Sequence, residues 1–164
     1  MHESSMEIMQ EFVTENRFFR NSSVAEIGSM DLNGTYRDVF DEFDYTGIDI
    51  AGGPGVDIVL KDSYKWNEIR DNSFDAVISG QAFEHVFKFW LVVAEMARIL
   101  KPGGRLCIVA PGAGPSHRHP DYYRFSPDAL GGLVKMVGLD VIKTGSDPRE
   151  PWHDSYVFAT KAVI

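Results

Sequence analysis

The segment 111–124 concentrates side chains that could bind and deprotonate a polar molecule. It carries two histidines, two tyrosines and two arginines within a few positions: His117, Arg118, His119, Tyr122, Tyr123 and Arg124. Histidine is the natural general base near neutral pH, because its ordinary pKa is about 6.5. The segment is locally basic in a chain of formal charge −8, which favours a polar ligand, anionic or sugar-like. The alternative is a structural loop in which the histidines cap and the aromatic rings pack.

A second set of chemical residues follows the first apolar run, 24–27. Gly28 comes directly after this run, and its lack of a Cβ lets a ligand approach the backbone closely. Glu26 places a carboxylate beside the same gap, where it suits an ammonium group better than a phosphate. Taken alone, the pattern is also typical of a tight turn with a solvated Glu26.

Aspartates follow the next two apolar runs. Asp49 lies 21 residues after Gly28, and an acidic residue about 20 positions on is placed to accept hydrogen bonds from ribose hydroxyls. Asp62 comes just past the third run and could accept a hydrogen bond from an adenine amino group. A lone aspartate more often caps a helix, but Glu26, Gly28 and Asp49 together predict an adenosine site.

The elements that must position these side chains alternate along the chain. Apolar runs predict strands at 24–27, 45–50, 56–60, 74–79, 105–110, 139–144 and 156–163. Helical spacing predicts helices at 1–20, 87–100 and 127–138. Ser4 and Glu7 fit a capping box for the first helix, a candidate lid, and Ser126 before Pro127 fits the start of the last. The residues KPGG at 101–104 predict the end of the middle helix.

This alternation predicts an α/β fold with a mostly parallel sheet covered on both faces. Ligands in such sheets bind at the carboxyl ends of the strands. With 164 residues and no internal repeat or linker-like stretch, we expect one domain spanning 1–164.

Composition narrows the function classes. The single cysteine, Cys107, excludes an internal disulfide framework and a multi-cysteine metal site. The formal charge of −8 and pI near 5.0 speak against non-specific binding to nucleic acid or to an anionic membrane. No run approaches the ~18 apolar residues of a membrane span, and the acidic start lacks the basic region of a signal peptide. A cytoplasmic protein is the expectation.

Four segments, in order, resemble motifs of class I S-adenosylmethionine-dependent methyltransferases. EIGSMDLNG (26–34) is similar to a variant first motif, and SFDAVIS followed by GQAFEHV (73–86) to the motif of the fourth strand. EMARILKPGGRL (95–106) is similar to the turn into the fifth strand, and HRHPDYYRFSPDAL (117–130) to a segment of a small subgroup, type 11-like. The resemblance implies a Rossmann-like three-layer sandwich, mostly parallel with an antiparallel C-terminal strand, and S-adenosylmethionine as the cofactor.

The resemblance also implies which residues hold the methionine end of the cofactor. Glu26 and Gly28 would hold it directly, in a loop that Ser29 and Asp31 also line. Gly80, after the fourth strand, would bring its backbone near the transferable methyl group.

For the adenosine end, the resemblance carries over to four further residues. Asp49 would bind the ribose hydroxyls, and Ile50 would pack on the adenine ring. Asp62 would contact the adenine amino group, with the backbone N–H of Ser63 beside it.

Methyl transfer is an in-line displacement, so the protein must align the acceptor and exclude water. The expected acceptor is a small polar molecule with an oxygen or nitrogen nucleophile. We expect His117 or His119 to act as general base. The candidate acceptor-binding residues are His85, Tyr122, Tyr123 and Arg124. For His85, hydrogen bonding at a helix start is the alternative interpretation.

A metal is not expected, because methyl transfer itself needs none. The set that could hold one is His117, His119, Asp121 and the distant His153. Spacing of the type His-x-His often arises by chance.

Two other functions stay open. A reduced glycine loop and small size fit a catalytically silent subunit that binds the cofactor or a partner on the same fold. A nicotinamide-dependent oxidoreductase is disfavoured, because G-x-G-x-x-G is missing and Glu26 would lie close to a pyrophosphate. Beyond the acceptor, we expect no nucleic acid and no membrane as partners, and a homodimer stays open.

Overall fold

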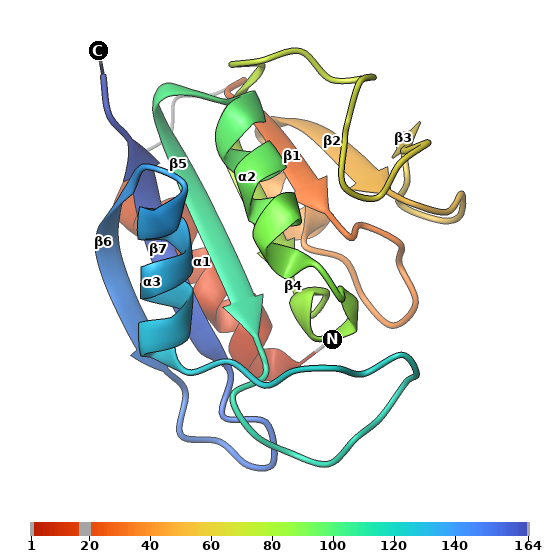
Figure 1. Ribbon diagram of the computed structural model, residues 1–164, viewed down its shortest axis with the longest axis vertical. Helices are drawn as coiled ribbons and strands as arrows, with labels where there is room; N and C mark the ends of the chain where they lie inside the picture. The colour runs from red at the N-terminus through yellow and green to blue at the C-terminus, as the bar shows by residue number, and fades with distance from the viewer. Residues whose placement is uncertain (1, 17–20, 164) are drawn as a thin grey trace.

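The centre of the computed structural model is a seven-stranded sheet (Figure 1). The structure describes residues 2–16 and 21–163. In chain order the strands are β1 Ser23–Ile27, β2 Asp44–Asp49, β3 Ile58–Val59, β4 Phe74–Gly80, β5 Leu100–Ala110, β6 Leu139–Ser146 and β7 Ser155–Lys161. Neighbouring strands among β1 to β5 pair in parallel. β7 runs antiparallel to both of its neighbours, which confirms the predicted sheet.

The order of strands in the sheet creates a crevice beyond the carboxyl ends of β1 and β4. The order is β3-β2-β1-β4-β5-β7-β6, so the chain moves outward in one direction from β1 and returns to the other side of it with β4. β1 and β4 lie in register, with Glu26 opposite Ile78. At such a switch point the loops leave in opposite directions, and a ligand can bind beyond the carboxyl ends of the strands.

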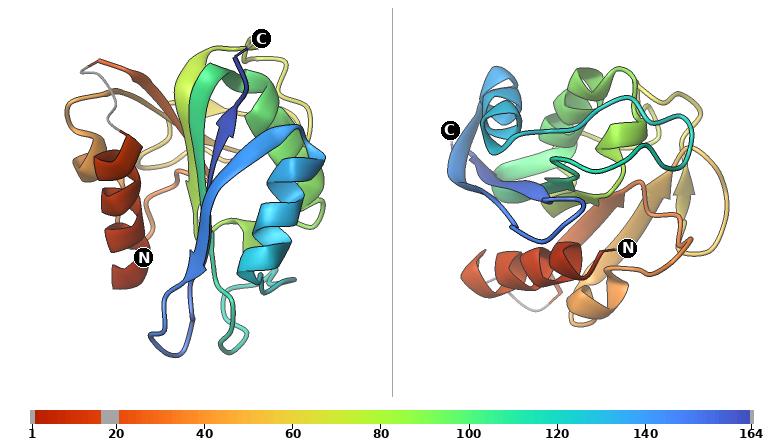
Figure 2. Two further views of the ribbon diagram at one scale, coloured as in Figure 1. Left: turned by 90° about the vertical axis from the view of Figure 1, so that its left-hand side faces the viewer. Right: turned by 90° about the horizontal axis from the view of Figure 1, so that it is seen from below.

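Helices cover both faces of the sheet, which gives the expected three layers (Figure 2). The helix α1 (Glu3–Asn16) and the short 3-10 turn η1 (Arg37–Phe40) lie on one face, and α2 (Phe89–Ile99) and α3 (Pro127–Met136) on the other. Met9 and Phe12 of α1 pack against Ile78, and Val93 and Met96 of α2 pack against the opposite face. A second 3-10 turn, η2 (Phe83–His85), follows β4.

The start of α3 follows the predicted capping chemistry. The Ser126 side chain accepts a hydrogen bond from the Ala129 N–H at 3.1 Å, and Pro127 occupies the first turn. Gly138, just beyond the helix, has φ +81°, the left-handed conformation that glycine adopts readily.

The predicted capping box of the first helix is wrong. Ser4 lies inside α1, and its hydroxyl donates to Asp154 at 2.5 Å. The Glu7 carboxylate accepts from Arg149 at 2.6 Å instead of bonding its own helix. Contacts with distant residues therefore replace the local cap. The helix ends at Asn16, and residues 1 and 17–20 of the predicted segment lie outside the described part of the chain.

The segment 101–104 ends the helix as predicted but does not form a turn between helix and strand. Strand β5 begins at Leu100 and includes the whole segment. A shift in the pairing of β5 with β4 between Phe74 and Ala76 accommodates this added length. The predicted strand 56–60 shortens to Ile58–Val59. None of the helices in the described part of the chain has the length and apolar character of a membrane span.

Candidate functional site

A cavity of about 560 Å³ opens at the carboxyl ends of β1, β2 and β4. Its volume falls in the range of small-molecule sites, about 300–1,000 Å³. The predicted residues that line it are Glu26, Gly28, Ser29, Asp49, Ile50, Ser63, Gly80, His85, His117 and His119. The same cavity thus adjoins the predicted cofactor loops and the histidine-rich segment.

Two predicted cofactor residues lie outside the lining. Asp31 Oδ1 accepts from the Gly34 N–H at 2.8 Å, and Asp31 lines a separate shallow hollow beside Arg37. Asp62 Oδ1 accepts from the Tyr64 N–H at 2.7 Å. Both carboxylates organise their own loops.

Three predicted acceptor residues also lie outside the lining. The Tyr123 hydroxyl donates to the Phe87 carbonyl at 3.0 Å, and the exposed Tyr122 ring lies against Phe87. Arg124 binds both carboxylate oxygens of Asp121, at 2.6 and 2.9 Å. The two tyrosines thus attach the segment 111–125 to Phe87, whereas Arg124 braces the segment internally.

Glu26 is a buried carboxylate in the wall of the cavity. Only 4% of the residue is exposed, and its one printed hydrogen-bond donor is the Tyr45 hydroxyl. Burial raises its pKa to about 7, although the Tyr45 hydrogen bond and the charge of Arg37 oppose the shift. A cationic group entering the cavity would favour the ionised form of this carboxylate.

The loop after β1 comes close to the loop after β4. Gly28 has φ +79°, and a Cβ at this position would lie 2.7 Å from the Cβ of Ala82. The N–H groups of Gly28 and Ser29 both donate to the Ile48 carbonyl, at 2.9 and 3.2 Å. The Ser29 Oγ is buried and has no hydrogen-bond partner among the described residues. Ser29 itself lines the cavity, and a rotation of its side chain would be needed to bring the hydroxyl to a ligand there.

Asp49 organises the rim at the end of β2. Its carboxylate accepts backbone N–H groups from Met30 at 3.1 Å, Ile50 at 2.7 Å and Ala51 at 3.3 Å. A carboxylate offers about four acceptor positions, so capacity for a ligand hydroxyl remains. Ile50 beside it is 62% exposed, an apolar surface on which a flat ring could pack.

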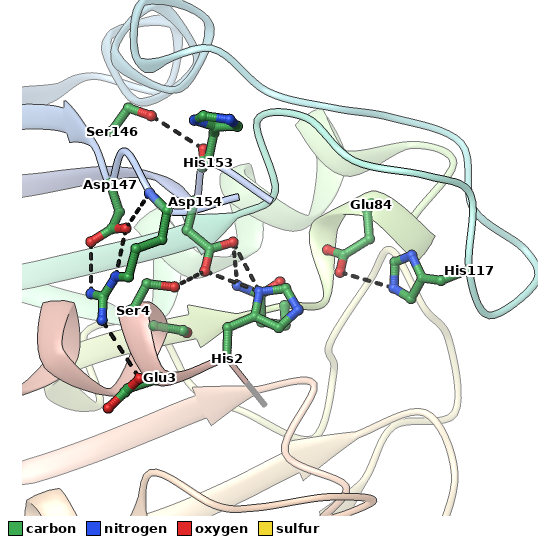
Figure 3. A network of polar contacts seen from close by, with 12 residues as sticks. His2, Glu3, Ser4, Glu84, His117, Ser146, Asp147, His153 and Asp154 are labelled. Carbon is green, nitrogen blue, oxygen red and sulfur yellow. Dashed lines mark hydrogen bonds and ion pairs between the residues drawn. The ribbon is translucent and has the colours of Figure 1, made fainter. Parts of the chain in front are cut away.

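Asp154 is a buried carboxylate that the sequence analysis did not identify. It lies beside Ser4 and His2 (Figure 3). It accepts from Ser4, from Gln81 at 3.0 Å and from His2 at 3.0 Å. Burial opposes its ionisation, but these hydrogen bonds hold the pKa of Asp154 below its usual value. His2 also lines the cavity and stacks on Trp152 with ring centroids 4.8 Å apart. Nothing local in the sequence relates residue 2 to residue 154.

Glu84 is a second buried carboxylate that sequence reasoning passed over, although it lies inside the GQAFEHV motif. His85 and His117 approach it, at 3.6 and 3.8 Å from Oε1. Burial lowers the pKa of His117, because desolvation disfavours the charged ring. His119 lines the same cavity but is exposed.

Comparison with known proteins relates this arrangement to one family. Residues 23–108, just over half of the chain, match the family described as methyltransferase domain. No curated protein matches the sequence.

Solved structures with the same fold share little sequence with this chain. The 1,6-didemethyltoxoflavin-N1-methyltransferase of Burkholderia thailandensis, solved with S-adenosylhomocysteine, has a TM-score of 0.74 at 16% identity, over 98% of this chain and 79% of that one. A second structure is phosphoethanolamine N-methyltransferase 2 of Haemonchus contortus, solved with S-adenosyl-L-methionine. It has a TM-score of 0.71 at 14% identity, and the match covers 95% of this chain and 52% of that one. The cyclase SpnF has a TM-score of 0.76 at 13% identity, and the match covers 97% of this chain and 81% of that one.

Proposed function

Because this chain belongs to the methyltransferase domain family, with its class I fold and S-adenosylmethionine as cofactor, we propose that it methylates a small polar acceptor. The acceptor carries an oxygen or nitrogen nucleophile and is anionic or sugar-like. The supporting observation is the continuity of the cavity, which is lined by Glu26 and Asp49 at one end and by His85 and His117 at the other. An acceptor at the histidine end would lie directly beside the cofactor.

Each residue at the cofactor end has a role that its chemistry supports. When bound, S-adenosylmethionine supplies an electrophilic methyl group on a sulfonium, a leaving group that needs no further activation. The Glu26 carboxylate would hold the ammonium group, and the unpartnered Ser29 hydroxyl would bond the same end. Asp49 would accept from a ribose hydroxyl, and Ile50 would pack on the adenine.

At the acceptor end, the chain's task is to align a nucleophile and remove its proton. Correct alignment can be worth up to roughly 7–11 kcal/mol in well-oriented systems. His117 is the first candidate base, because it is half-buried and lines the cavity together with His85. His119 is the second candidate. Gly80 lines the same cavity, and its backbone would lie near the transferable methyl group.

Calorimetry with S-adenosylhomocysteine tests the cofactor half of the proposal. We expect saturable binding, weakened about tenfold or more in Asp49→Ala, because a lost ligand hydrogen bond to a charged group is worth about 1.5–3 kcal/mol. Asp62→Ala is the matched control, since the Asp62 carboxylate bonds its own loop. Absence of binding by the intact protein, with Asp49→Ala behaving identically, would overturn the proposal.

Transfer of a labelled methyl group tests the other half. A panel of small hydroxyl and amino compounds, including sugars and anionic molecules, should contain an acceptor that is labelled by the intact protein. Cofactor binding without labelling of any class of acceptor would instead favour the catalytically silent subunit. The fold alone does not decide between these outcomes, since the cyclase SpnF shares it.

A further inference from the structure

We propose that Glu84, His85 and His117 form a binding site for a divalent transition metal, with Zn²⁺ as the first candidate. Their potential ligand atoms, one from each side chain, all lie within 4.8 Å of one another. They come from η2 and from the segment 111–125, which meet at the acceptor end of the cavity. The metal set considered from the sequence shares only His117 with this one.

The measured distances suit a metal. Zn²⁺ binds imidazole nitrogen and carboxylate oxygen at about 2.0–2.2 Å, which places neighbouring tetrahedral ligands about 3.4 Å apart. The Nε2 atoms of His85 and His117 lie 3.6 and 3.8 Å from Glu84 Oε1. Side-chain movements of a few tenths of an ångström would bring these two pairs to that spacing (Figure 3 shows Glu84 and His117). The third pair, between the two histidines, lies within 4.8 Å, so a rotation of one ring would complete the set.

The hydrogen bond of His85 engages Nδ1 and leaves Nε2, the nitrogen that faces Glu84, free to bind a metal. Its Nδ1 lies 2.5 Å from the Pro120 carbonyl oxygen, and a carbonyl can only accept, so Nδ1 carries the hydrogen. In the neutral ring Nε2 then presents a lone pair toward the Glu84 carboxylate. Two acceptors that face each other at this distance need a cation between them, either a proton or a metal. Donation of the second ring nitrogen to an oxygen is the usual arrangement of a metal-binding histidine.

His117 has a comparable outer partner. Its Nδ1 lies 3.2 Å from Asp121 Oδ2, although not in good hydrogen-bond geometry. Asp121 is itself fixed by Arg124 and by the His117 backbone N–H at 2.9 Å. A small rotation of the ring would complete a carboxylate–histidine–metal arrangement.

Glu84 supplies an independent indication of a missing cation. Its side chain is 1% exposed, and Oε2 has no hydrogen-bond partner in the part of the chain that the structure describes. A buried carboxylate is costly unless it is paired or coordinates a metal. Its backbone is held in place, because the Tyr122 N–H donates to the Glu84 carbonyl at 2.7 Å.

Two histidines and one carboxylate leave at least one coordination position open. Catalytic zinc sites have this form, and the same ligand set also binds Fe²⁺. All three residues line the cavity, so the open position is accessible to a ligand there. If the proposed methyl transfer is correct, a metal at this site would occupy His117 and leave His119 as the base. A hydroxyl acceptor bound at the open position would lose its proton to His119 more readily, because the metal lowers the pKa of that hydroxyl.

Metal content and Co²⁺ spectroscopy test the site without reference to activity. Protein without an affinity tag is dialysed against Zn²⁺, then against metal-free buffer, and its metal is measured by mass spectrometry; Co²⁺ is titrated in parallel and followed by its visible absorption. We expect about one metal ion per chain. His117→Ala and Glu84→Gln should each weaken binding at least tenfold, since each removes one of three ligands.

The exposed His119, two positions from His117 in the same segment, provides the matched control. His119→Ala should keep the metal stoichiometry of the intact protein. A folded protein that binds no metal would overturn the proposal, and so would metal that persists in both His117→Ala and Glu84→Gln. Binding of S-adenosylhomocysteine, measured on the same samples, separates failure of the metal site from failure of the proposed function.

Discussion

The two ends of the cavity are built in different ways. At the cofactor end, backbone groups and short loops after β1, β2 and β4 set the geometry, and every important residue lies within a few positions of a strand end. At the acceptor end, side chains from residues 2–4, 81–85, 117–124 and 152–154 meet through contacts between distant parts of the chain. The first end depends on backbone conformation and the second on side-chain chemistry, so the two should respond differently to substitution.

The sharpest test of this difference is Gly28→Ala at the cofactor end. A residue with a Cβ pays about 1–2 kcal/mol for the left-handed conformation, and overpacking against Ala82 adds about 1–3 kcal/mol. We therefore expect a loss of roughly 2–5 kcal/mol in the free energy of unfolding, measured in urea, and loss of S-adenosylhomocysteine binding.

Gly132→Ala is the matched control for that substitution. Gly132 lies inside α3, and a Cβ there would meet nothing within 4 Å. Alanine should stabilise the helix by about 0.5–1 kcal/mol. Equal effects of the two substitutions would contradict the importance of backbone conformation at the cofactor end.

The next largest effect concerns Glu26 and pH. The pKa of Glu26 is raised by burial from 4.5 to about 7, so the folded state holds its proton where the unfolded state has lost it. The resulting stability is fully present below pH 4.5 and is lost as the pH rises through 7, a change on the order of 3 kcal/mol. Glu26→Gln should remove this part of the pH dependence in urea unfolding measured from pH 4.5 to 8.

The exposed Glu68 serves as control, because Glu68→Gln makes the same substitution outside the cavity. Adding S-adenosylhomocysteine extends the same measurement to the contact between Glu26 and the cofactor. Its ammonium group favours ionised Glu26, so the stabilisation by S-adenosylhomocysteine should increase from pH 5 to 8. Stabilisation that is independent of pH would speak against contact between Glu26 and the ammonium group.

The smallest of the three effects belongs to the acceptor end. Asp154→Asn preserves shape but turns one acceptor into a donor that faces His2, Ser4 and Gln81, at a cost of about 1–3 kcal/mol. The loss should be local, so hydrogen exchange should accelerate in α1 more than in β1 and β4. Uniform acceleration over all three elements would show that the two ends are not separable.

The sequence predicts the cofactor end of the cavity better than the acceptor end. Ser126 and Pro127 begin α3 as expected, and Gly28, Glu26 and Asp49 reach the cavity, because their roles depend on neighbours in the chain. Ser4 was misread, because the distant Asp154 provides a better partner than its own helix. The approach of Glu84 to His117 joins positions 33 apart, and no local pattern encodes such a distance.

The hydrogen bond from Ser4 to Asp154 spans 150 positions of the chain, and this has a consequence for the order of events during synthesis. The cofactor loops of β1, β2 and β4 are complete once residue 86 has left the ribosome, but Asp154, the partner of Ser4, is made only after β5 and β6. Until then Ser5 can bond Tyr36, but the contacts of His2 and Ser4 with Asp154 cannot form. Contacts of such large sequence separation form slowly, so the nascent chain should acquire the wall for its cofactor well before the wall for its acceptor.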